Sequence, residues 1–175
     1  MAATLRITVI HGSLLDADVD VIVNAANSLG VMGGGVAGVI KRAAGQIVED
    51  EARRQGPIPV GRAVLTSGGA TRFKAIIHAP TMPSPGMRIP ATHVGLATLA
   101  ALSLADERGF ASVAIPGMGT GVGGVAPADA AREMISAIDT FSADRLHAVV
   151  LIDVDTSMVE AWRACLQRLG TGHAT

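Results

Sequence analysis

The sequence lacks several residue types that stabilise small domains or build metal sites. It has no tyrosine, one tryptophan and one cysteine among 175 residues. Cys165 alone cannot form an intrachain disulfide, and no Cys and His cluster has the spacing of zinc ligands. A chain of this length buries roughly 70% of its unfolded surface, so we expect one domain, residues 1–175, that needs no disulfide and no metal.

The sequence also has little net charge and no long apolar run. Its 14 basic and 15 acidic residues give a formal charge of −1, which marks no surface for nucleic acid or membrane. The longest uncharged run, residues 109–128, contains prolines and many glycines, unlike a membrane span. Residues 1–6 lack a basic start followed by an apolar run, so we expect a cytoplasmic protein without a signal peptide, a membrane partner or sequence-specific nucleic-acid binding.

What the sequence does contain is an alternation of strand and helix patterns. Strand patterns lie at residues 4–10, 21–27, 62–66, 74–79, 112–115 and 146–152. Helix patterns lie at residues 36–44, 46–55, 93–108, 127–140 and 156–169, and residues 170–175 are expected to fray. Interleaved elements predict an α/β fold, a three-layer α/β/α sandwich whose central mixed sheet of about six strands has helices on both faces.

The most informative stretch is residues 21–45. A buried strand, VIV, continues through NAAN at residues 24–27 to GGG at residues 33–35, and a helix follows. Glycines let backbone N–H groups approach a ligand, and a helix start adds unpaired N–H groups and a partial positive charge. This order predicts an anion site, most often for phosphate. The alternative is a flexible glycine turn with asparagine turn bonds; two amides at the end of a buried strand favour the ligand site.

A second glycine loop, residues 117–124, also follows a strand and precedes a helix. Gly119, Gly121 and Gly124 match GxGxxG, the dinucleotide fingerprint. The match lies late in the chain, whereas a Rossmann unit carries it after its first strand, so an NAD-dependent oxidoreductase is the weaker alternative. Residues 33–38 have the glycine spacing of a P-loop, but Val39 and Ile40 stand where Lys and Ser/Thr are needed, which disfavours a nucleoside triphosphatase.

NAAN followed by GGGV, at residues 24–27 and 33–36, resembles the motif of the macrodomain family, whose members bind ADP-ribose. The resemblance extends over about residues 12–159. It implies that the two loops clamp the diphosphate and the distal ribose of ADP-ribose, or of an ADP-ribosylated protein or metabolite, without a cofactor. The implied ligand-binding residues are Ser13, Leu14, Asn24, Ala26, Asn27, Gly33, Gly34, Gly35, Val36, Gly117, Gly119, Thr120, Gly121, Val122, Gly123 and Ile152.

Three positions depart from the family pattern at the ligand. Ser13 stands where many members have an aspartate that accepts a hydrogen bond from adenine. Ile152 stands where many members stack an aromatic on adenine, and Gly123 where some place an aromatic near the distal ribose. A neutral hydroxyl accepts a weaker bond than a carboxylate. We therefore predict weaker ADP-ribose binding than that of the family's best binders.

The resemblance implies a catalytic role for Asn27, which would face the distal ribose and position an attacking water, and for Gly35 beside it. It implies a supporting role for Asn24. Members that remove ADP-ribose from acidic side chains often have an aspartate where this sequence has Ala37. Met32 likewise stands where histidine is common, and it cannot donate a proton.

No side-chain base is therefore obvious in the sequence. His11 and His78 are the nearest candidates by strand placement, but a packed or hydrogen-bonded histidine is the commoner outcome. Family members with alanine after GGGV are similar to enzymes that hydrolyse ADP-ribosyl esters, where the asparagine and the substrate's phosphate orient the water. The resemblance thus implies hydrolysis of ADP-ribosyl Asp or Glu esters, or deacetylation of O-acetyl-ADP-ribose. A non-catalytic ADP-ribose reader is the alternative.

Overall fold

A six-stranded sheet runs through the computed structural model, which describes residues 4–170. Its strands are β1 (Arg6–His11), β2 (Val21–Asn27), β3 (Val64–Thr66), β4 (Ala75–Met82), β5 (Ser112–Ile115) and β6 (Ala148–Asp153). The order across the sheet is β1-β6-β5-β2-β4-β3, with β3 antiparallel to β4 and all other neighbours parallel. The predicted mixed sheet is therefore confirmed. The predicted frayed tail lies, apart from Gly170, outside the described residues.

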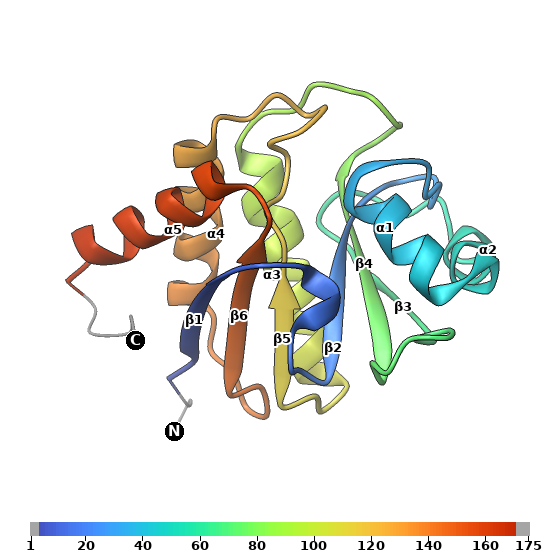
Figure 1. Cartoon of the computed structure of the whole chain (residues 1–175), viewed down its shortest axis with the longest axis horizontal. Helices are drawn as coiled ribbons and strands as arrows, with labels where there is room; N and C mark the ends of the chain where they lie inside the picture. The colour runs from blue at the N-terminus through green and yellow to red at the C-terminus, as the bar shows by residue number, and fades with distance from the viewer. Residues whose placement is uncertain (1–3, 171–175) are drawn as a thin grey trace.

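Helices cover both faces of the sheet. They are α1 (Gly35–Ala44), α2 (Gln46–Arg54), α3 (Thr92–Glu107), α4 (Pro127–Thr140) and α5 (Thr156–Arg168). Successive strand residues point to opposite faces. Val21 and Val23 of β2 therefore pack in the core beneath α3, α4 and α5, while Ile22 packs beneath α1 and α2. Figure 1 shows α1 and α2 towards the right and α4 and α5 towards the left. Two apolar clusters on opposite faces confirm the three-layer sandwich.

Local sequence signals set several helix boundaries. Pro127 is the first residue of α4, where its missing N–H costs nothing. Gly45 separates α1 from α2 at φ 98°, and Gly109 follows α3 at φ 78°, both in the left-handed region that glycine tolerates. Within the described residues 4–170, none of these helices has the length and apolar character needed to cross a membrane.

Two strand ends differ from the predicted ones for long-range reasons. β4 continues through Pro80 to Met82, because β3 pairs only with residues 76–78 and leaves the far side of β4 without a neighbour at the proline. β6 begins at Ala148 instead of residue 146, because the Asp106 carboxylate takes the N–H groups of residues 144–146. β1 likewise spans Arg6–His11 instead of residues 4–10.

The parallel strands bring their carboxyl ends to one edge of the sheet. β1, β6, β5, β2 and β4 are parallel neighbours, so the segments after them leave from the same edge. In Figure 1 this edge is at the top, where the gold loop after β5 lies beside the lime loop that joins β4 to α3. Ligands in open α/β sheets bind outside this edge.

Candidate functional site

The first glycine loop, residues 28–36, has one half with paired N–H groups and one half without. Ser28 N donates to Met82 O at 2.9 Å, Gly30 N to Asn27 O at 3.1 Å, and Met32 N to Glu49 Oε2 at 2.6 Å. The backbone N–H groups of residues 33–36 have no acceptor within the described part of the chain. The last two of these begin α1, whose first N–H groups have no partner inside the helix. This half of the loop therefore offers a run of donors.

The space above this run is open. Gly33, Gly34 and Gly35 are exposed, and a Cβ atom built on any of them meets nothing within 4 Å. Gly35 has φ +57°, which favours glycine, whereas Gly34 at φ −152° is in extended backbone that any residue adopts. Glycine at position 34 thus keeps the backbone N–H groups accessible, and its backbone conformation does not itself require glycine.

Asn27 shapes the first loop with its side chain. Its Oδ1 accepts from Leu29 N at 3.1 Å and from Val31 N at 3.3 Å, and its Nδ2 donates to Val31 O at 2.8 Å. These bonds use both lone pairs of Oδ1 and one of the two hydrogens of Nδ2, so one amide hydrogen is left for a ligand. The side chain is 9% exposed. The predicted contact with the distal ribose stays a prediction, and the side chain could meet it only as a donor.

A buried chain of polar side chains joins β3, β4 and β2 across the sheet. Thr66 Oγ1 donates to Ser67 O at 3.0 Å, so it accepts from His78 Nε2 at 2.9 Å, and His78 Nδ1 accepts from Asn24 Nδ2 at 3.1 Å. His78 is fully buried, and that burial lowers its pKa from 6.5 to about 4 against a small opposing effect of Glu51. His78 is therefore a neutral structural group. Asn24, 1% exposed, supports the end of β2 through this chain.

Glu49 of α2 anchors the start of the glycine run, and no sequence signal predicts it. Its carboxylate accepts from Met32 N at 2.6 Å, from Gln46 Nε2 at 2.9 Å and from Lys41 Nζ at 3.1 Å. Burial raises the pKa of Glu49, but these hydrogen bonds outweigh it and hold the pKa below its ordinary value. Met32 itself is buried. Residues 32 and 49 are separated by a turn and a helix, so only the fold brings them together.

The second glycine loop also contains a run of unpaired N–H groups, here between two paired ends. Gly117 N donates to Asp153 Oδ2 at 2.9 Å, and at the other end Gly124 N donates to Gly121 O at 3.1 Å. Between them, residues 118–123 have N–H groups for which residues 4–170 provide no acceptor. Val122 is 69% exposed at the tip, and Thr120 is half-buried. The loop thus carries a second run of N–H groups without an acceptor, of which residues 119–122 are not buried.

The second loop is closely packed at Gly119 and Gly123, although Gly121 at its tip is as open as Gly33 and Gly34. A Cβ on Gly119, which has φ +76°, would lie 2.8 Å from Val94 Cγ2, and one on Gly123 would lie 2.6 Å from Gly119 O. Any side chain at position 123 therefore requires another loop path. This explains physically why the aromatic that some relatives carry there is missing from this sequence.

The segments after β1 and β6 form the remaining part of the edge. Ser13 Oγ accepts from Leu15 N at 3.3 Å and caps a short 3-10 helix, Leu14–Asp16. Ile152 is 2% exposed and packs in the core with Leu14, so both present little surface to a ligand. The exposed apolar side chain here is Val154, 70% exposed, which sequence patterns do not distinguish.

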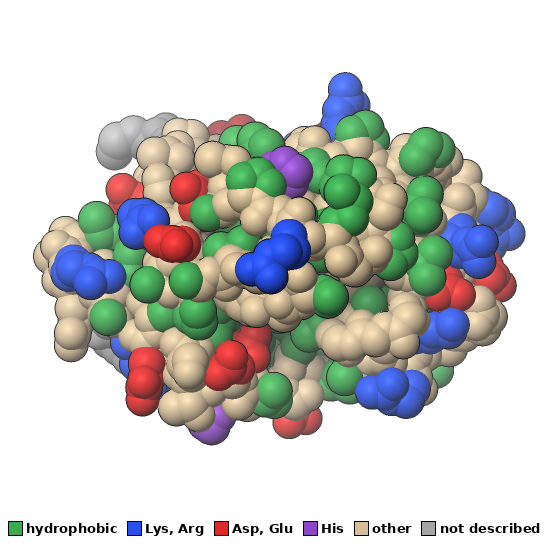
Figure 2. Space-filling model, turned by 90° about the horizontal axis from the view of Figure 1, so that it is seen from above, with side chains coloured by type: hydrophobic (Ala, Val, Ile, Leu, Met, Phe, Trp, Pro, Cys, Tyr) green, Lys and Arg blue, Asp and Glu red, His purple; other side chains and the backbone are tan. Residues whose placement is uncertain are grey.

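Asp153 connects these parts of the edge. Its backbone oxygen accepts from Gly12 N at 2.9 Å, and its carboxylate accepts from Gly117 N at 2.9 Å and from Asp155 N at 2.9 Å. β2 and β5 are parallel neighbours as well, so the two glycine loops leave adjacent strands. The structure thus gathers the predicted residues along one edge. Seen from that side in Figure 2, the middle is mostly backbone and uncharged side chains, with a basic side chain near the centre and most other charges towards the rim.

Residues 23–134 match the Macro domain family. This chain belongs to that family. It is 55% identical over 162 residues to an uncharacterized protein of Aquifex aeolicus, and this alignment covers 93% of this chain and 98% of that protein. It is 40% identical over 141 residues to an O-acetyl-ADP-ribose deacetylase of Citrobacter rodentium, covering 78% and 80%. The Trypanosoma brucei macrodomain in complex with ADP-ribose superposes with a TM-score of 0.83 at 25% identity, over 92% of this chain and 69% of that one.

The sheet order of this macro domain also separates it from dinucleotide dehydrogenases. Their doubly wound sheets have the order 3-2-1-4-5-6, with the GxGxxG turn after the first strand. Here the order is β1-β6-β5-β2-β4-β3, and the glycine pattern follows β5. The late position of GxGxxG is therefore a property of the macro domain fold.

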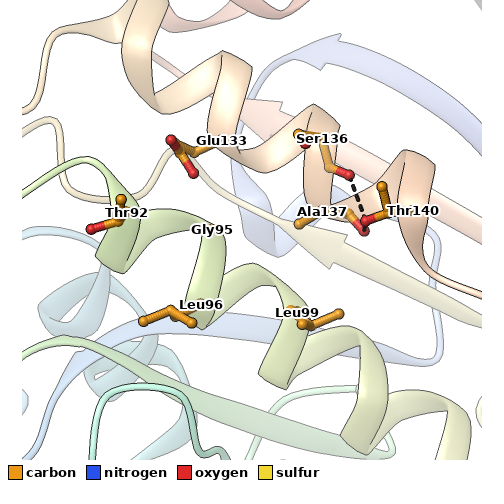
Figure 3. Close-up of a pocket in the computed structure, with 8 residues that line it drawn as sticks. All are labelled: Thr92, Gly95, Leu96, Leu99, Glu133, Ser136, Ala137 and Thr140. Atoms are coloured by element: carbon orange, nitrogen blue, oxygen red, sulfur yellow. Dashed lines mark hydrogen bonds between the residues drawn. The ribbon is translucent and has the colours of Figure 1, made fainter.

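A separate groove of about 330 Å³ lies between α3 and α4 and includes no residue of the glycine loops. In Figure 3, Leu96 and Leu99 of α3 lie across from Ser136, Ala137 and Thr140 of α4, with Glu133 near Gly95. A largely apolar wall with one carboxylate is unsuited to a diphosphate. We therefore place the ligand site at the sheet edge and not in this groove.

Proposed function

We propose that this macro domain binds ADP-ribose at the carboxyl edge of its sheet and hydrolyses ADP-ribosyl esters there. The observation that carries the proposal is the pair of N–H runs, residues 33–36 and 118–123, for which the described residues hold no acceptor. Such runs at glycine loops and a helix start suit phosphate oxygens. The name of the Citrobacter rodentium relative and the ADP-ribose complex of the Trypanosoma brucei macrodomain support the same ligand.

The proposed substrates are mono-ADP-ribosylated Asp or Glu side chains and O-acetyl-ADP-ribose. Both contain an ester. In the Asp and Glu esters, water adds to the anomeric carbon and the bond from that carbon to the carboxylate oxygen breaks; the leaving carboxylate has a conjugate acid of pKa about 4, so it departs without a strong acid. Deacetylation of O-acetyl-ADP-ribose instead breaks the bond from the acyl carbon to oxygen and releases a ribose hydroxyl, which has to take up a proton. Around the first glycine loop, the described residues offer no evident side-chain acid or base: Met32 is 1% exposed, Ala37 is 9% exposed and His78 is buried. Chemistry that needs little proton transfer from the protein fits this environment best.

Positioning of the water is then the main contribution of the protein. Asn27 has one amide hydrogen left, which we assign to a ribose hydroxyl or to the water. Its Oδ1 already accepts two bonds, so a phosphate oxygen of the substrate takes the proton of the water. Well-oriented groups can lower a barrier by up to about 7–11 kcal/mol, so a missing base is compatible with turnover.

The decisive experiment incubates the protein with glutamate-ADP-ribosylated peptide and follows release of the label. Gly34→Glu is the best negative control, because its side chain extends into open space and carries a negative charge over the donors without left-handed strain. Gly34→Ala is its matched variant and should keep most activity. Asn27→Ala is less suitable, since it also removes three bonds that shape the loop.

The same experiment separates the hydrolase from the reader. Release by the wild type and by Gly34→Ala, but not by Gly34→Glu, supports the hydrolase. Binding of ADP-ribose without release would leave a reader module, the alternative favoured by the lack of a side-chain base. Absence of ADP-ribose binding by calorimetric titration would reject both.

A further inference from the structure

The loop between β4 and α3, residues 83–91, packs onto the second glycine loop. Ile89 N donates to Gly123 O at 3.0 Å, and Ile89 Cδ1 is 3.1 Å from the position of a Cβ on Gly119. Next to it, the Arg88 guanidinium lies against Gly124: a Cβ there would be 2.8 Å from Nη2, 3.0 Å from Cζ and 3.2 Å from Nε. The third glycine of the GxGxxG pattern therefore makes room for Arg88.

Arg88 has no acceptor of its own in the described part of the chain. Some arginines in residues 4–170 have one, since Arg72 donates to Ala17 O at 2.7 Å and Arg132 pairs with Asp129 at 2.6 Å, whereas other exposed arginines, such as Arg163, have none either. Arg88 is exposed, and it makes neither a hydrogen bond nor an ion pair within those residues. Its N–H donors are thus available, and the guanidinium lies over the backbone of Gly124.

The position of this guanidinium fits an anion held by the second loop. Gly124 directly follows residues 118–123, the run of unpaired N–H groups, so Arg88 adds a full positive charge at one end of that run. Guanidinium groups bind phosphate oxygens in a bidentate geometry that neutral N–H groups do not provide. A site with so few charges would gain its main cationic contact from this residue.

We propose that Arg88 is a ligand-binding residue that donates to a phosphate oxygen of the diphosphate. This inference rests on the proposed function, since it assumes the same ligand at the same edge. It assigns a role to the loop between β4 and α3, which no sequence motif identifies. It also predicts that affinity for the diphosphate depends on salt more strongly than backbone donors alone would require.

The test measures the dissociation constants of ADP-ribose, ADP and AMP by calorimetry at several NaCl concentrations. Arg88→Met, which keeps the chain length but not the charge, should weaken ADP-ribose and ADP by about tenfold, as expected for one charged hydrogen bond. It should also flatten the salt dependence, and AMP should lose less. Arg88→Lys should lie between. Arg163→Met, which removes an exposed arginine of α5, should match the wild type.

The outcomes separate this inference from the proposed function. Unchanged binding by Arg88→Met, or weaker binding with an unchanged salt dependence, would make Arg88 a packing residue and overturn the inference alone. A loss confined to ADP-ribose would place Arg88 at the distal ribose and overturn the diphosphate contact. A wild type that binds none of the three nucleotides would reject the proposed function itself. Unfolding midpoints of all variants without ligand confirm that each is folded.

Discussion

The two glycine loops offer the same donors but use glycine for opposite reasons. In the first loop, a Cβ on Gly33 or Gly34 would meet nothing within 4 Å, so glycine there keeps the backbone accessible. In the second loop, a Cβ on Gly119 or Gly123 would lie within 3 Å of a neighbouring atom, so glycine there permits close packing. Access therefore explains glycine at positions 33 and 34, and packing explains it at positions 119 and 123, although Gly121 of the second loop is also open.

Their supports differ as well. The first loop is tied to a buried carboxylate, that of Glu49, and follows β2, whose Asn24 belongs to the polar chain through His78. The second loop rests on Val94 and on Ile89, with Asp153 holding only its first N–H group. The stability that depends on the first loop should consequently change with pH, and the stability that depends on the second loop should change with the volume of the side chains in it. The predictions below test this difference.

Adding one methyl group to each loop should give the largest contrast. Gly119→Ala combines a left-handed residue, at about 1–2 kcal/mol, with a clash against buried Val94, and we expect a loss of about 3 kcal/mol in the free energy of unfolding. Gly34→Ala, in extended backbone and open space, should stay within about 0.5 kcal/mol of the wild type. Urea unfolding measures both. Equal losses would show that the two loops are packed alike.

Mild acid should weaken the support of the first loop. The pKa of His78 is lowered by burial from 6.5 to about 4, so between these values the unfolded chain binds more protons than the folded one. Its contribution is complete above pH 6.5 and is lost as pH falls towards 4; between pH 7 and pH 5 we expect a loss of about 2 kcal/mol. Urea unfolding at both pH values measures this loss.

The matched controls for this pH effect are two histidine variants. His78→Asn should remove most of this slope, the dependence of the unfolding free energy on pH. It should also lower stability at pH 7, because it shortens the buried polar chain. His11→Asn, which replaces an exposed histidine bonded to Val154 O, should keep the slope. A slope that survives His78→Asn would assign it to another group.

Replacing the anchor of the first loop should have a smaller effect. Glu49→Gln keeps one carbonyl oxygen for Met32 N but turns an amide towards Lys41, and we expect a loss of about 1–2 kcal/mol at pH 7. Because the pKa of Glu49 is lowered, its contribution is present above 4.5 and is lost as pH falls through the folded value. Urea unfolding measures the loss. Exposed Glu160→Gln is the control, and an equal loss there would contradict a specific anchor.

Local signals predicted most of the fold, and contacts between distant segments account for the rest. β5 and α4 have the predicted bounds, because a short apolar run and Pro127 define them locally. β6 begins later than predicted because Asp106 binds the preceding N–H groups, and no pattern near residue 146 reveals this. Strand ends set by a side chain from another element are beyond local reasoning.

The same distinction applies to the site. Glycine runs after strands predict N–H donors, since the donor is the backbone itself. The groups that hold those runs are side chains such as Glu49 and Asp153, which lie 17 and 36 residues from the N–H groups they accept. Only the sheet order and helix packing bring such pairs together, so the sequence predicted the runs of free N–H groups but not their supports.

The smallest expected effect tests the polar attachment of the second loop. Asp153 accepts from Gly117 N with one oxygen and from Asp155 N with the other, whereas Asp153→Asn keeps one acceptor. We expect a loss of about 1 kcal/mol in unfolding free energy, against none for exposed Asp139→Asn.

Asp153→Asn also removes a negative charge near the proposed diphosphate, which by itself would strengthen anion binding. At about 1 M salt, where charges are screened within about 3 Å, only the lost attachment should remain, and ADP-ribose should bind a few-fold more weakly. Unchanged affinity at that salt concentration would mean that packing alone holds the second loop, which would strengthen the contrast between the loops.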